Sequence, residues 1–368
     1  MPPVPRRSIH LPAPGTKRAV VIGAGSFGTA VAVLLARGGL RTTLQARTPE
    51  QARALGETRE NHAYLSGVEL PRELRIEHIG AGALQRADYV FVGVPSLALE
   101  EVIDGLEPNG LPDKAAIVSL AKGLVPPAGE PPTVIISRRF GSRRTACIGG
   151  PAHAQEMVSA GAGLVAASTE EELANAIAGV FIRAGVVCEE SNDPIGVELA
   201  GAAKNAAALA TGATEAQGLN AAGAAAGHIF AEVWRWAEAE GARPESMIGL
   251  SGTGDLVATA LAPMSRNRRA GELLAKGVPA AEIPAQVGQA VEALESVPLL
   301  AHALDRAGVE APVTRALGRL ISGELPLEEW VAVVRTTIPP PARWLPAVRG
   351  GFWRRLRERV RSWFSRDK

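Results

Sequence analysis

The sequence predicts a doubly wound α/β domain built on a parallel sheet, followed by an all-helical domain. Two observations support the first domain: short apolar runs alternate with helical patterns, and a glycine-rich hexapeptide follows the first run. Such alternation is typical of parallel strands joined by right-handed crossovers. A third observation supports the second domain, because from Pro194 onward the chain is rich in Ala and Gly and has few β-branched runs.

The first β/α unit has the clearest pattern. The apolar run within Arg18–Ile22 predicts a short buried strand that stops at Gly23. Helical periodicity over Thr29–Arg37 then predicts a helix, and Arg41–Gln45 predicts a second strand. Four later apolar runs predict further strands over residues 89–94, 116–120, 146–148 and 163–167.

In the second half, small residues recur at helical spacing and would let neighbouring backbones come close. They are Gly196, Ala200, Ala203, Ala207 and Ala210. Prolines are expected to separate successive helices. They are Pro244, Pro263, Pro279, Pro284, Pro298 and Pro312. We therefore expect a disordered tail over 1–17, a dinucleotide-binding domain over 18–193, a helical substrate domain over 194–338 and a basic amphipathic extension over 339–368.

The composition excludes several classes of protein. A chain of 368 residues has room for about two domains. It is 46% hydrophobic and 21% charged, which argues against intrinsic disorder and collagen-like repeats despite its 40 Gly and 27 Pro. The two cysteines, Cys147 and Cys188, argue against a disulfide framework, so we expect a reducing compartment, the cytoplasm.

The charge is distributed unevenly along the chain. The net charge is +1, but residues 1–18 carry +4 and residues 341–368 carry +7, which leaves −10 for the residues between them. An acidic body is a poor surface for nucleic acid, so single cations inside it are better suited to a small anionic ligand. No run of about 18 apolar residues predicts a membrane-spanning helix.

The glycine-rich hexapeptide is Gly23-Ala24-Gly25-Ser26-Phe27-Gly28. Between a strand and a helix, this pattern is typical of dinucleotide binding. The first glycine allows a tight turn, the second lets a pyrophosphate approach the backbone, and the third lets the helix pack against the strand. An ordinary glycine-rich turn is the alternative interpretation.

The end of the second strand bears on the choice of cofactor. An acidic residue would hold the ribose hydroxyls of NAD there, but the chain has Arg47 and Thr48. Because an arginine can pair with a 2′-phosphate, we expect NADP(H) to be used at least as well as NAD(H). A solvated Arg47 is the alternative.

Lys204 is the only Lys or Arg between Arg183 and Arg235, and it lies in an Ala-rich helical pattern. Burial lowers the pKa of a lysine, and such an amine can exchange a proton with an alcohol or carbonyl oxygen. The alternative is a lysine whose amine extends to solvent.

Other polar segments suit an anionic substrate. Lys122 follows a predicted strand and should lie at the carboxyl edge of the sheet, unless it is an ordinary loop lysine. Asp255 either caps a helix or accepts a hydrogen bond from the substrate and a lysine. The cluster of Ser265, Arg266 and Asn267 suits a phosphate, with a solvated basic face as the alternative. Metal-ligand spacings and a hydrolase elbow are both missing.

Taken in order, these segments resemble the bacterial NAD(P)-dependent glycerol-3-phosphate dehydrogenase family over residues 17–336. Beyond the glycine loop, the resemblance is carried by Asn61-His62-Ala63-Tyr64-Leu65, Val94-Pro95-Ser96, Ala121-Lys122-Gly123-Leu124, Ile195-Gly196-Val197-Glu198-Leu199, Lys204-Asn205, Gly254-Asp255-Leu256-Val257 and Ser265-Arg266-Asn267-Arg268-Arg269. It implies a Rossmann-type domain and an all-α domain of the 6-phosphogluconate dehydrogenase-like type. It also implies reversible hydride transfer between NAD(P)H and C2 of dihydroxyacetone phosphate, which supplies sn-glycerol 3-phosphate for phospholipid synthesis.

The resemblance implies roles for single residues and makes a homodimer plausible. Lys204 would be the proton acceptor in the oxidation direction. The substrate would be held by Lys122, Gly150, Lys204, Asp255, Ser265, Arg266 and Asn267. The cofactor would contact Gly23, Gly25, Ser26, Phe27, Gly28, Arg47, Lys122, Ala154 and Arg266, with Glu292 closing over it.

The chain departs from the family pattern in three places. Ala152 stands where the family has a hydroxyl that contacts substrate, and losing a hydrogen bond to a charged group costs roughly 1.5 to 3 kcal/mol unless water replaces it. Thr48 replaces an acid, and residues 211–220 differ from the family's glycine-rich text. The alternatives are therefore a catalytically weak nucleotide-binding homologue with a regulatory or scaffolding role, or a dehydrogenase of the same fold with another small anionic substrate.

Residues 341–368 are foreign to the family pattern. On a helical wheel the apolar residues fall within an arc of about 120° and arginines occupy the rest. The apolar residues are Phe352, Trp353, Leu356, Val360, Trp363 and Phe364. This pattern predicts peripheral contact with an anionic membrane through residues 352–364. A disordered basic tail and a helix docked on the acidic body are the alternatives.

Overall fold

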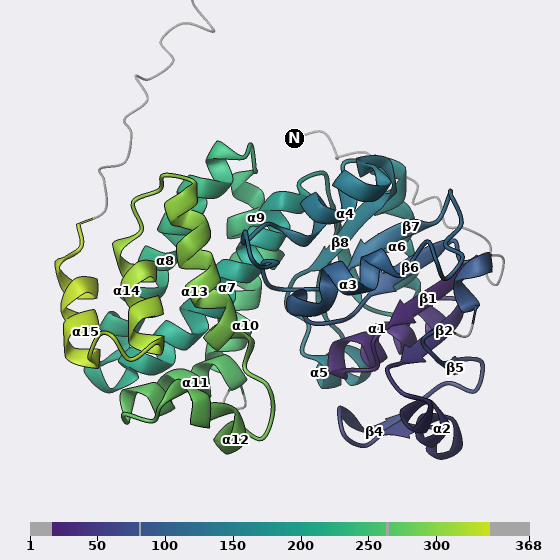
Figure 1. The fold of residues 1–368 in the computed structure, drawn as a ribbon, viewed down its shortest axis with the longest axis horizontal. Helices are drawn as coiled ribbons and strands as arrows, with labels where there is room; N and C mark the ends of the chain where they lie inside the picture. Colours follow the sequence, from purple (N-terminus) through teal and green to yellow (C-terminus); the bar gives the residue numbers. More distant parts are fainter. Residues whose placement is uncertain (1–16, 81, 263–264, 339–368) are drawn as a thin grey trace, which may run out of the picture. The chain divides into compact units, whose positions relative to one another are not determined.

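The protein is described by a computed structural model over residues 17–80, 82–262 and 265–338. The expected N-terminal tail, except Lys17, and the extension over 339–368 with its amphipathic segment therefore lie outside the described residues. Within these ranges every strand lies between Arg18 and Ser191, and the chain from Pro194 to Thr336 forms helices (Figure 1).

An eight-stranded sheet forms the centre of the first part, in the order β10-β9-β8-β7-β6-β1-β2-β5. Its strands are β1 (Arg18–Ile22), β2 (Arg41–Ala46), β5 (Arg75–His78), β6 (Tyr89–Val92), β7 (Ala116–Ser119), β8 (Thr145–Gly149), β9 (Gly163–Ala167) and β10 (Val187–Ser191). The six predicted strands are confirmed. The sequence missed β5 and β10, because both lie at sheet edges and carry mostly exposed or half-buried residues.

One pairing contradicts the expected parallel sheet. Strands β8 and β9 are antiparallel, whereas the other neighbours pair in parallel. The connection between them contains only α5 (Ala154–Ser159), which is about 9 Å long. A five-residue strand spans roughly 17 Å. This helix is therefore too short to carry the chain back to the edge of the sheet where β8 begins, which a parallel β9 would require.

Helices cover both faces of the sheet. The core on one face includes α1 (Ser26–Arg37) and α6 (Glu171–Arg183), and the core on the other includes α3 (Leu99–Asp104) and α4 (Pro132–Phe140). The antiparallel pair β3 (Glu60–Asn61) and β4 (Leu65–Glu69), together with α2 (Pro49–Thr58), lies outside this main sheet. The strand order reverses between β1 and β6, which places a ligand crevice at their carboxyl ends.

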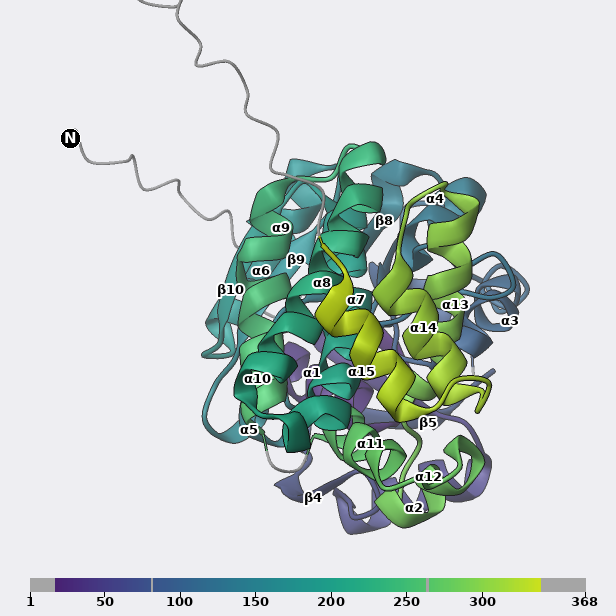
Figure 2. The same ribbon diagram turned by 90° about the vertical axis from the view of Figure 1, so that its left-hand side faces the viewer.

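Helix α7 (Pro194–Thr214) is the central helix of the second part (Figure 2). It contacts α8 (Leu219–Ala239), α9 (Pro244–Ile248), α10 (Asp255–Leu261), α11 (Arg266–Ala275) and α13 (Glu292–Arg306). The remaining α-helices of this part are α12 (Ile283–Val287), α14 (Pro312–Ile321) and α15 (Leu327–Thr336).

Two helix backbones come close where α7 crosses α11, at two glycines that are not among the five small residues named from the sequence. A Cβ atom built on Gly212 would lie 2.0 Å from the carbonyl oxygen of Arg268, and one built on Gly271 would lie 2.0 Å from that of Leu209. The prediction that Pro298 separates two helices is wrong, because it lies inside α13. Buried side chains on both sides of the proline keep that helix continuous by tertiary packing.

Candidate functional site

The glycine loop between β1 and α1 has the geometry of a phosphate cradle. Gly23 has a φ of 110°, and a Cβ atom on it would lie 2.4 Å from the carbonyl oxygen of Gly93. A Cβ on Gly28 would lie 2.1 Å from the carbonyl oxygen of Gly23, whereas one on Gly25 would meet no atom within 4 Å. The loop therefore leaves open space at its middle glycine, beside the N-terminus of α1, and fits a dinucleotide pyrophosphate.

Asn61 supports this loop from the β3–β4 pair. Its side-chain amide donates to the carbonyl oxygen of Ala24 at 3.0 Å and to the Thr29 hydroxyl at 2.8 Å. The side chain is buried, so these bonds are shielded from water. The sequence contained Asn61 only as part of a family string, and no local pattern indicated its partners.

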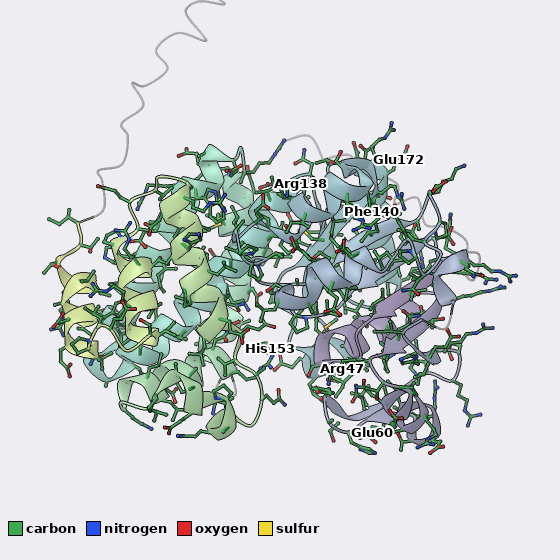
Figure 3. The ribbon with its side chains drawn as sticks, in the orientation of Figure 1. Arg47, Glu60, Arg138, Phe140, His153 and Glu172 are labelled. Carbon is green, nitrogen blue, oxygen red and sulfur yellow. The ribbon has the colours of Figure 1, made fainter. Side chains whose placement is uncertain are left out.

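Arg47 and Thr48 have different roles at the end of β2. The Thr48 hydroxyl accepts a hydrogen bond from the backbone N–H of Gln51 at 3.2 Å and caps α2, which accounts for a threonine here. Arg47 is exposed directly after β2 (Figure 3). That strand end is where the ribose of a bound dinucleotide lies in this kind of fold.

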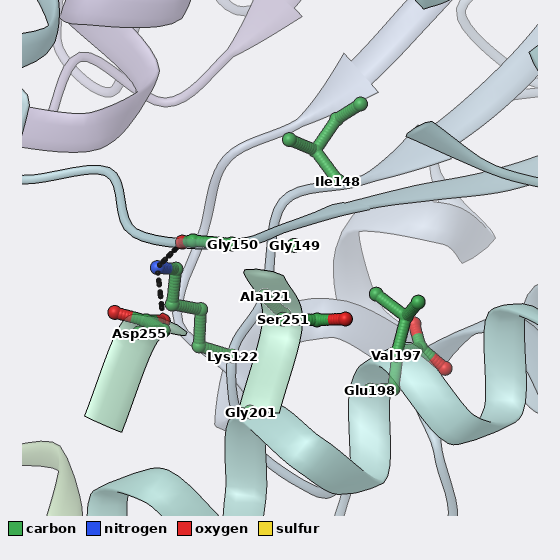
Figure 4. A pocket seen from close by; sticks show the side chains of 10 residues that line it. All are labelled: Ala121, Lys122, Ile148, Gly149, Gly150, Val197, Glu198, Gly201, Ser251 and Asp255. Atoms are coloured by element: carbon green, nitrogen blue, oxygen red, sulfur yellow. Dashed lines mark hydrogen bonds and ion pairs between the residues drawn. The ribbon is translucent and has the colours of Figure 1, made fainter. Parts of the chain in front are cut away.

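Two lysines share one carboxylate at the carboxyl edge of the sheet, and Figure 4 shows one of them, Lys122, between Asp255 and Gly150. The amine of Lys122, just beyond β7, donates to Asp255 Oδ2 at 3.0 Å and to the carbonyl oxygen of Gly150 at 3.1 Å. The amine of Lys204, on α7, lies 3.5 Å from the same Oδ2. The structure therefore brings together four of the predicted substrate residues, from four separate segments of the chain.

Burial controls the ionisation of this cluster. Lys204 is 6% exposed, and burial lowers its pKa, although Asp255 and Glu292 raise it in part. Burial raises the pKa of Asp255, but Lys122 and Lys204 lower it by more, so that its net pKa lies below the ordinary value. Of the two interpretations of Lys204, the desolvated one holds and the solvent-reaching one does not.

A chain of side-chain amides surrounds the lysines. The Asn205 amide donates to the carbonyl oxygen of Lys122 and to Glu292 Oε2, both at 3.3 Å. Asn267 donates to Asn205 Oδ1 at 2.9 Å and accepts from the backbone N–H of Ala293 at 3.3 Å. Asn205 therefore links Lys122 to Glu292 and Asn267. The sequence indicated Asn205 only by its place beside Lys204.

The segment after β8 carries the carbonyl oxygen of Gly150, which accepts from Lys122. Gly150 has a φ of 96°, and a Cβ on it would lie 2.2 Å from the carbonyl oxygen of Gly163, so only glycine fits. Ala152 is buried, and Ala154 is the first residue of α5. The Nε2 atom of His153 is buried without a hydrogen-bond partner, and His153 acts electrostatically on Asp255.

The predicted phosphate cluster is only partly assembled around the lysines. Ser265 caps α11 by accepting from the backbone N–H of Arg268, and exposed Arg266 donates to the carbonyl oxygen of Ala290 at 3.0 Å. Arg268 is not a solvated basic residue, because its guanidinium makes two hydrogen bonds to Glu215, at 2.7 and 2.8 Å. Phe27 lies under Lys122, with 5.3 Å between the amine and the ring centre.

Across the described ranges, no group of three or more His, Cys, Asp or Glu residues could hold a metal ion. No helix in those same ranges is long and apolar enough to cross a membrane. The amines of Lys122 and Lys204 on Asp255 can transfer protons and bind anions, and they lie near the glycine loop through the contact of Lys122 with Phe27.

The comparisons with known proteins agree with this geometry. The family model for the NAD-dependent glycerol-3-phosphate dehydrogenase N-terminus matches residues 18–174, and the model for the C-terminus matches residues 193–332. A glycerol-3-phosphate dehydrogenase (NAD(P)+) from Deinococcus radiodurans is 38% identical over 83% of this chain and 90% of its own length. One from Frankia casuarinae is 38% identical over 88% of this chain and 98% of its own length.

Solved structures agree on the fold. A glycerol-3-phosphate dehydrogenase from Coxiella burnetii superposes with a TM-score of 0.80 at 28% identity, over 87% of this chain and 99% of that one. A ketopantoate reductase from Ralstonia eutropha has a TM-score of 0.57 at 19% identity, over 85% of this chain and 99% of that one, and shares the fold alone. The family models, the curated relatives and the assembled lysine cluster lead to one conclusion: the chain belongs to the NAD-dependent glycerol-3-phosphate dehydrogenase family.

Proposed function

We propose that this chain catalyses reversible hydride transfer between NADPH or NADH and C2 of dihydroxyacetone phosphate, forming sn-glycerol 3-phosphate for phospholipid synthesis. The observation that carries the proposal is the pair of amines on Asp255, assembled at the carboxyl edge of the sheet close to the glycine loop. A catalytically weak scaffolding protein would have no need to keep a buried lysine of lowered pKa there.

Lys204 is the proposed proton donor and acceptor. When bound, the nicotinamide supplies or accepts the hydride at C2. A lowered pKa makes the Lys204 ammonium a stronger acid than a free lysine, so it protonates the C2 oxygen of the ketone more readily. In the oxidation direction the neutral amine takes the proton from the C2 hydroxyl. Asp255 holds the amine in place at 3.5 Å.

The remaining residues bind and orient. Lys122 and Gly150 are proposed to hold the hydroxyl end of the substrate, and Arg266 with Ser265 and Asn267 its phosphate. The proposed cofactor contacts are Gly23, Gly25, Ser26, Phe27, Gly28, Arg47, Lys122, Ala154, Arg266 and Glu292. Lys122 contacts both Phe27, in the glycine loop, and Asp255, the carboxylate that also lies 3.5 Å from the Lys204 amine.

The test is NADPH consumption with dihydroxyacetone phosphate and a panel of other ketones. The panel contains dihydroxyacetone, which lacks the phosphate, and ketopantoate and pyruvate, which carry a carboxylate instead. We expect turnover with the phosphorylated ketone and at least a hundredfold lower kcat/KM for the others, because several charged hydrogen bonds are lost. Equal turnover of a carboxylated ketone would reassign the substrate, and no turnover with any ketone would leave the scaffolding alternative.

Two finer proposals rest on the sequence. The first is a homodimer of a cytoplasmic enzyme, which light scattering of the purified chain tests by its molar mass.

The second is membrane contact through residues 352–364, which lie outside the described residues. Flotation with anionic liposomes at low salt should recover the full chain and not a chain stopped at Thr337. Equal recovery of both chains would remove the proposal.

A further inference from the structure

Glu198 is a buried carboxyl group on α7, and the proton-transfer step above does not use it. It is 5% exposed, and both of its carboxylate oxygens lie against Thr133. The backbone N–H of Thr133 is 3.1 Å from Oε1 and 3.0 Å from Oε2, and the Thr133 hydroxyl is 2.6 Å from Oε2. Burying a carboxyl group is unfavourable unless hydrogen bonds compensate, and here one threonine makes all three.

Thr133 is near the start of α4, where the helix needs an outside partner. The helix begins at Pro132, after Pro131, and no side chain of its own caps it. Proline has no N–H, so the N–H of Thr133 is the first that the helix offers. Glu198 therefore caps α4 from another helix and connects α7 to the end of the loop that starts at Lys122.

The loop from Lys122 to Thr133 is closed on itself and attached to α7 at both ends. Val125 and Glu130 exchange two backbone hydrogen bonds, at 2.9 and 3.2 Å, which closes the loop. At the first end, Asn205 donates to the carbonyl oxygen of Lys122 at 3.3 Å. At the second end, Glu198 holds Thr133.

The two attachment points lie on one face of α7. Glu198 and Asn205 are about two helical turns apart, so their side chains point in nearly the same direction. Gly201 lies between them, and a Cβ on it would be 3.7 Å from the carbonyl oxygen of Lys122, so the loop packs close to the helix. In Figure 4 the carboxyl group of Glu198 points away from the Lys122 amine.

We propose that Glu198 is a positioning residue: by anchoring Thr133 to α7, it fixes the loop that places the Lys122 amine beside Asp255 and Lys204. Glu198 itself touches no reacting atom. The inference rests on the role of Lys122 in substrate binding proposed above. A loop free at Thr133 would keep the Asn205 contact and the hydrogen bond from Arg306 to the carbonyl oxygen of Ala128, at 2.7 Å. It would lose its second attachment to α7 and would hold the Lys122 amine less accurately.

The first test compares Glu198→Leu with Glu198→Gln. Glutamine keeps both contacts, because its carbonyl oxygen accepts from the Thr133 N–H and its amide donates to the hydroxyl. Leucine has a similar volume and removes both. We expect Glu198→Leu to lower kcat/KM for dihydroxyacetone phosphate about tenfold or more, mainly through KM, whereas Glu198→Gln stays within about threefold of the wild type. The Kd for NADPH should change less than the KM for the ketone in either variant, because Lys122 is the one proposed cofactor contact in this loop and the glycine loop is untouched.

The second test changes Thr133 instead of Glu198, and it remains informative if Glu198→Leu does not fold. Thr133→Val removes the hydroxyl with little change of shape, and Thr133→Ser keeps it. We expect Thr133→Val to raise KM for the ketone and Thr133→Ser to restore it. The inference is overturned if Thr133→Val and Thr133→Ser have the same KM, or if a folded Glu198→Leu matches Glu198→Gln.

A third readout does not depend on activity. Hydrogen exchange of the backbone amides over residues 122–131 should be faster in Glu198→Leu, or in Thr133→Val, than in the matched conservative variant. Unchanged exchange in both pairs would overturn the anchoring even if the enzyme is active. If the wild type does not reduce dihydroxyacetone phosphate, the proposed function fails, while faster loop exchange would still support the anchor.

Discussion

Replacing Lys204 by methionine should remove the proton-transfer step and leave the fold intact. Methionine is similar in length and carries no charge, so it can fill the buried space on α7. Asp255 keeps the Lys122 amine at 3.0 Å and the Thr259 hydroxyl at 3.3 Å, so the carboxylate does not become unpaired. We therefore expect a folded protein whose thermal midpoint changes little and whose affinity for NADPH is unchanged.

The expected loss of kcat is between about 10² and 10⁴, the usual contribution of a positioned acid or base. The structure argues against rescue by the other amine. Lys122 holds two hydrogen bonds, to Gly150 and Asp255. Breaking two such bonds of a charged group costs about 3 to 6 kcal/mol. That energy is comparable to the barrier increase itself, about 3 to 5 kcal/mol for this loss of rate.

The assay follows NADPH absorbance with saturating dihydroxyacetone phosphate. Lys114→Met is the control, because that lysine is exposed just before β7.

The pH dependence of the rate is a second check, because the direction of its change is predicted. Reduction needs the Lys204 ammonium, so its rate should fall as pH rises through the Lys204 pKa, and oxidation should show the opposite trend. Asp255 raises this pKa, so Asp255→Asn should move the fall to lower pH. A Lys204→Met enzyme that keeps a third of the wild-type kcat would refute the reasoning, and so would one whose reduction rate falls with rising pH as the wild-type rate does.

Three further predictions concern stability and cofactor choice. Burial raises the pKa of Glu198 to about 8, so the native state favours the protonated form. The contribution of Glu198 to the free energy of unfolding therefore declines as pH rises from about 4.5 to 8, by up to about 1.4 kcal/mol per pH unit. Urea unfolding of Glu198→Gln should lack this slope, and an identical slope in both proteins would contradict the shift. Arg47→Asp should move the ratio of kcat/KM values toward NADH by about tenfold or more, since a charged pair with the 2′-phosphate is lost, and an unchanged ratio would show a solvated arginine. Gly271→Ala should destabilise the protein by about 1 to 3 kcal/mol in chemical denaturation, because its Cβ would lie 2.0 Å from the carbonyl oxygen of Leu209. Gly223→Ala on α8, where a Cβ meets nothing within 4 Å, should be neutral or stabilising.

Local patterns predicted the features that depend on local physics. The six strands were found because each is a buried apolar run, and the glycine loop was found because its turn and close approaches require residues without a Cβ. The edge strands β5 and β10 escaped because partial exposure weakens their apolar pattern. The strand β9 was predicted, but its antiparallel direction was not, because strand direction depends on the length and packing of the connection, which periodicity does not contain.

The sequence by itself determined the alternation of strands and helices, the cradle for a dinucleotide and a single lysine within an apolar helix. Only the tertiary structure decided that this lysine is desolvated and shares Asp255 with Lys122, a residue 133 positions away from that carboxylate along the chain. It also decided that Glu198 and Asn205 hold the Lys122 loop at both ends. The reason is physical: a pKa and a hydrogen bond depend on which atoms exclude water from a group, and those atoms come from segments that only folding brings together.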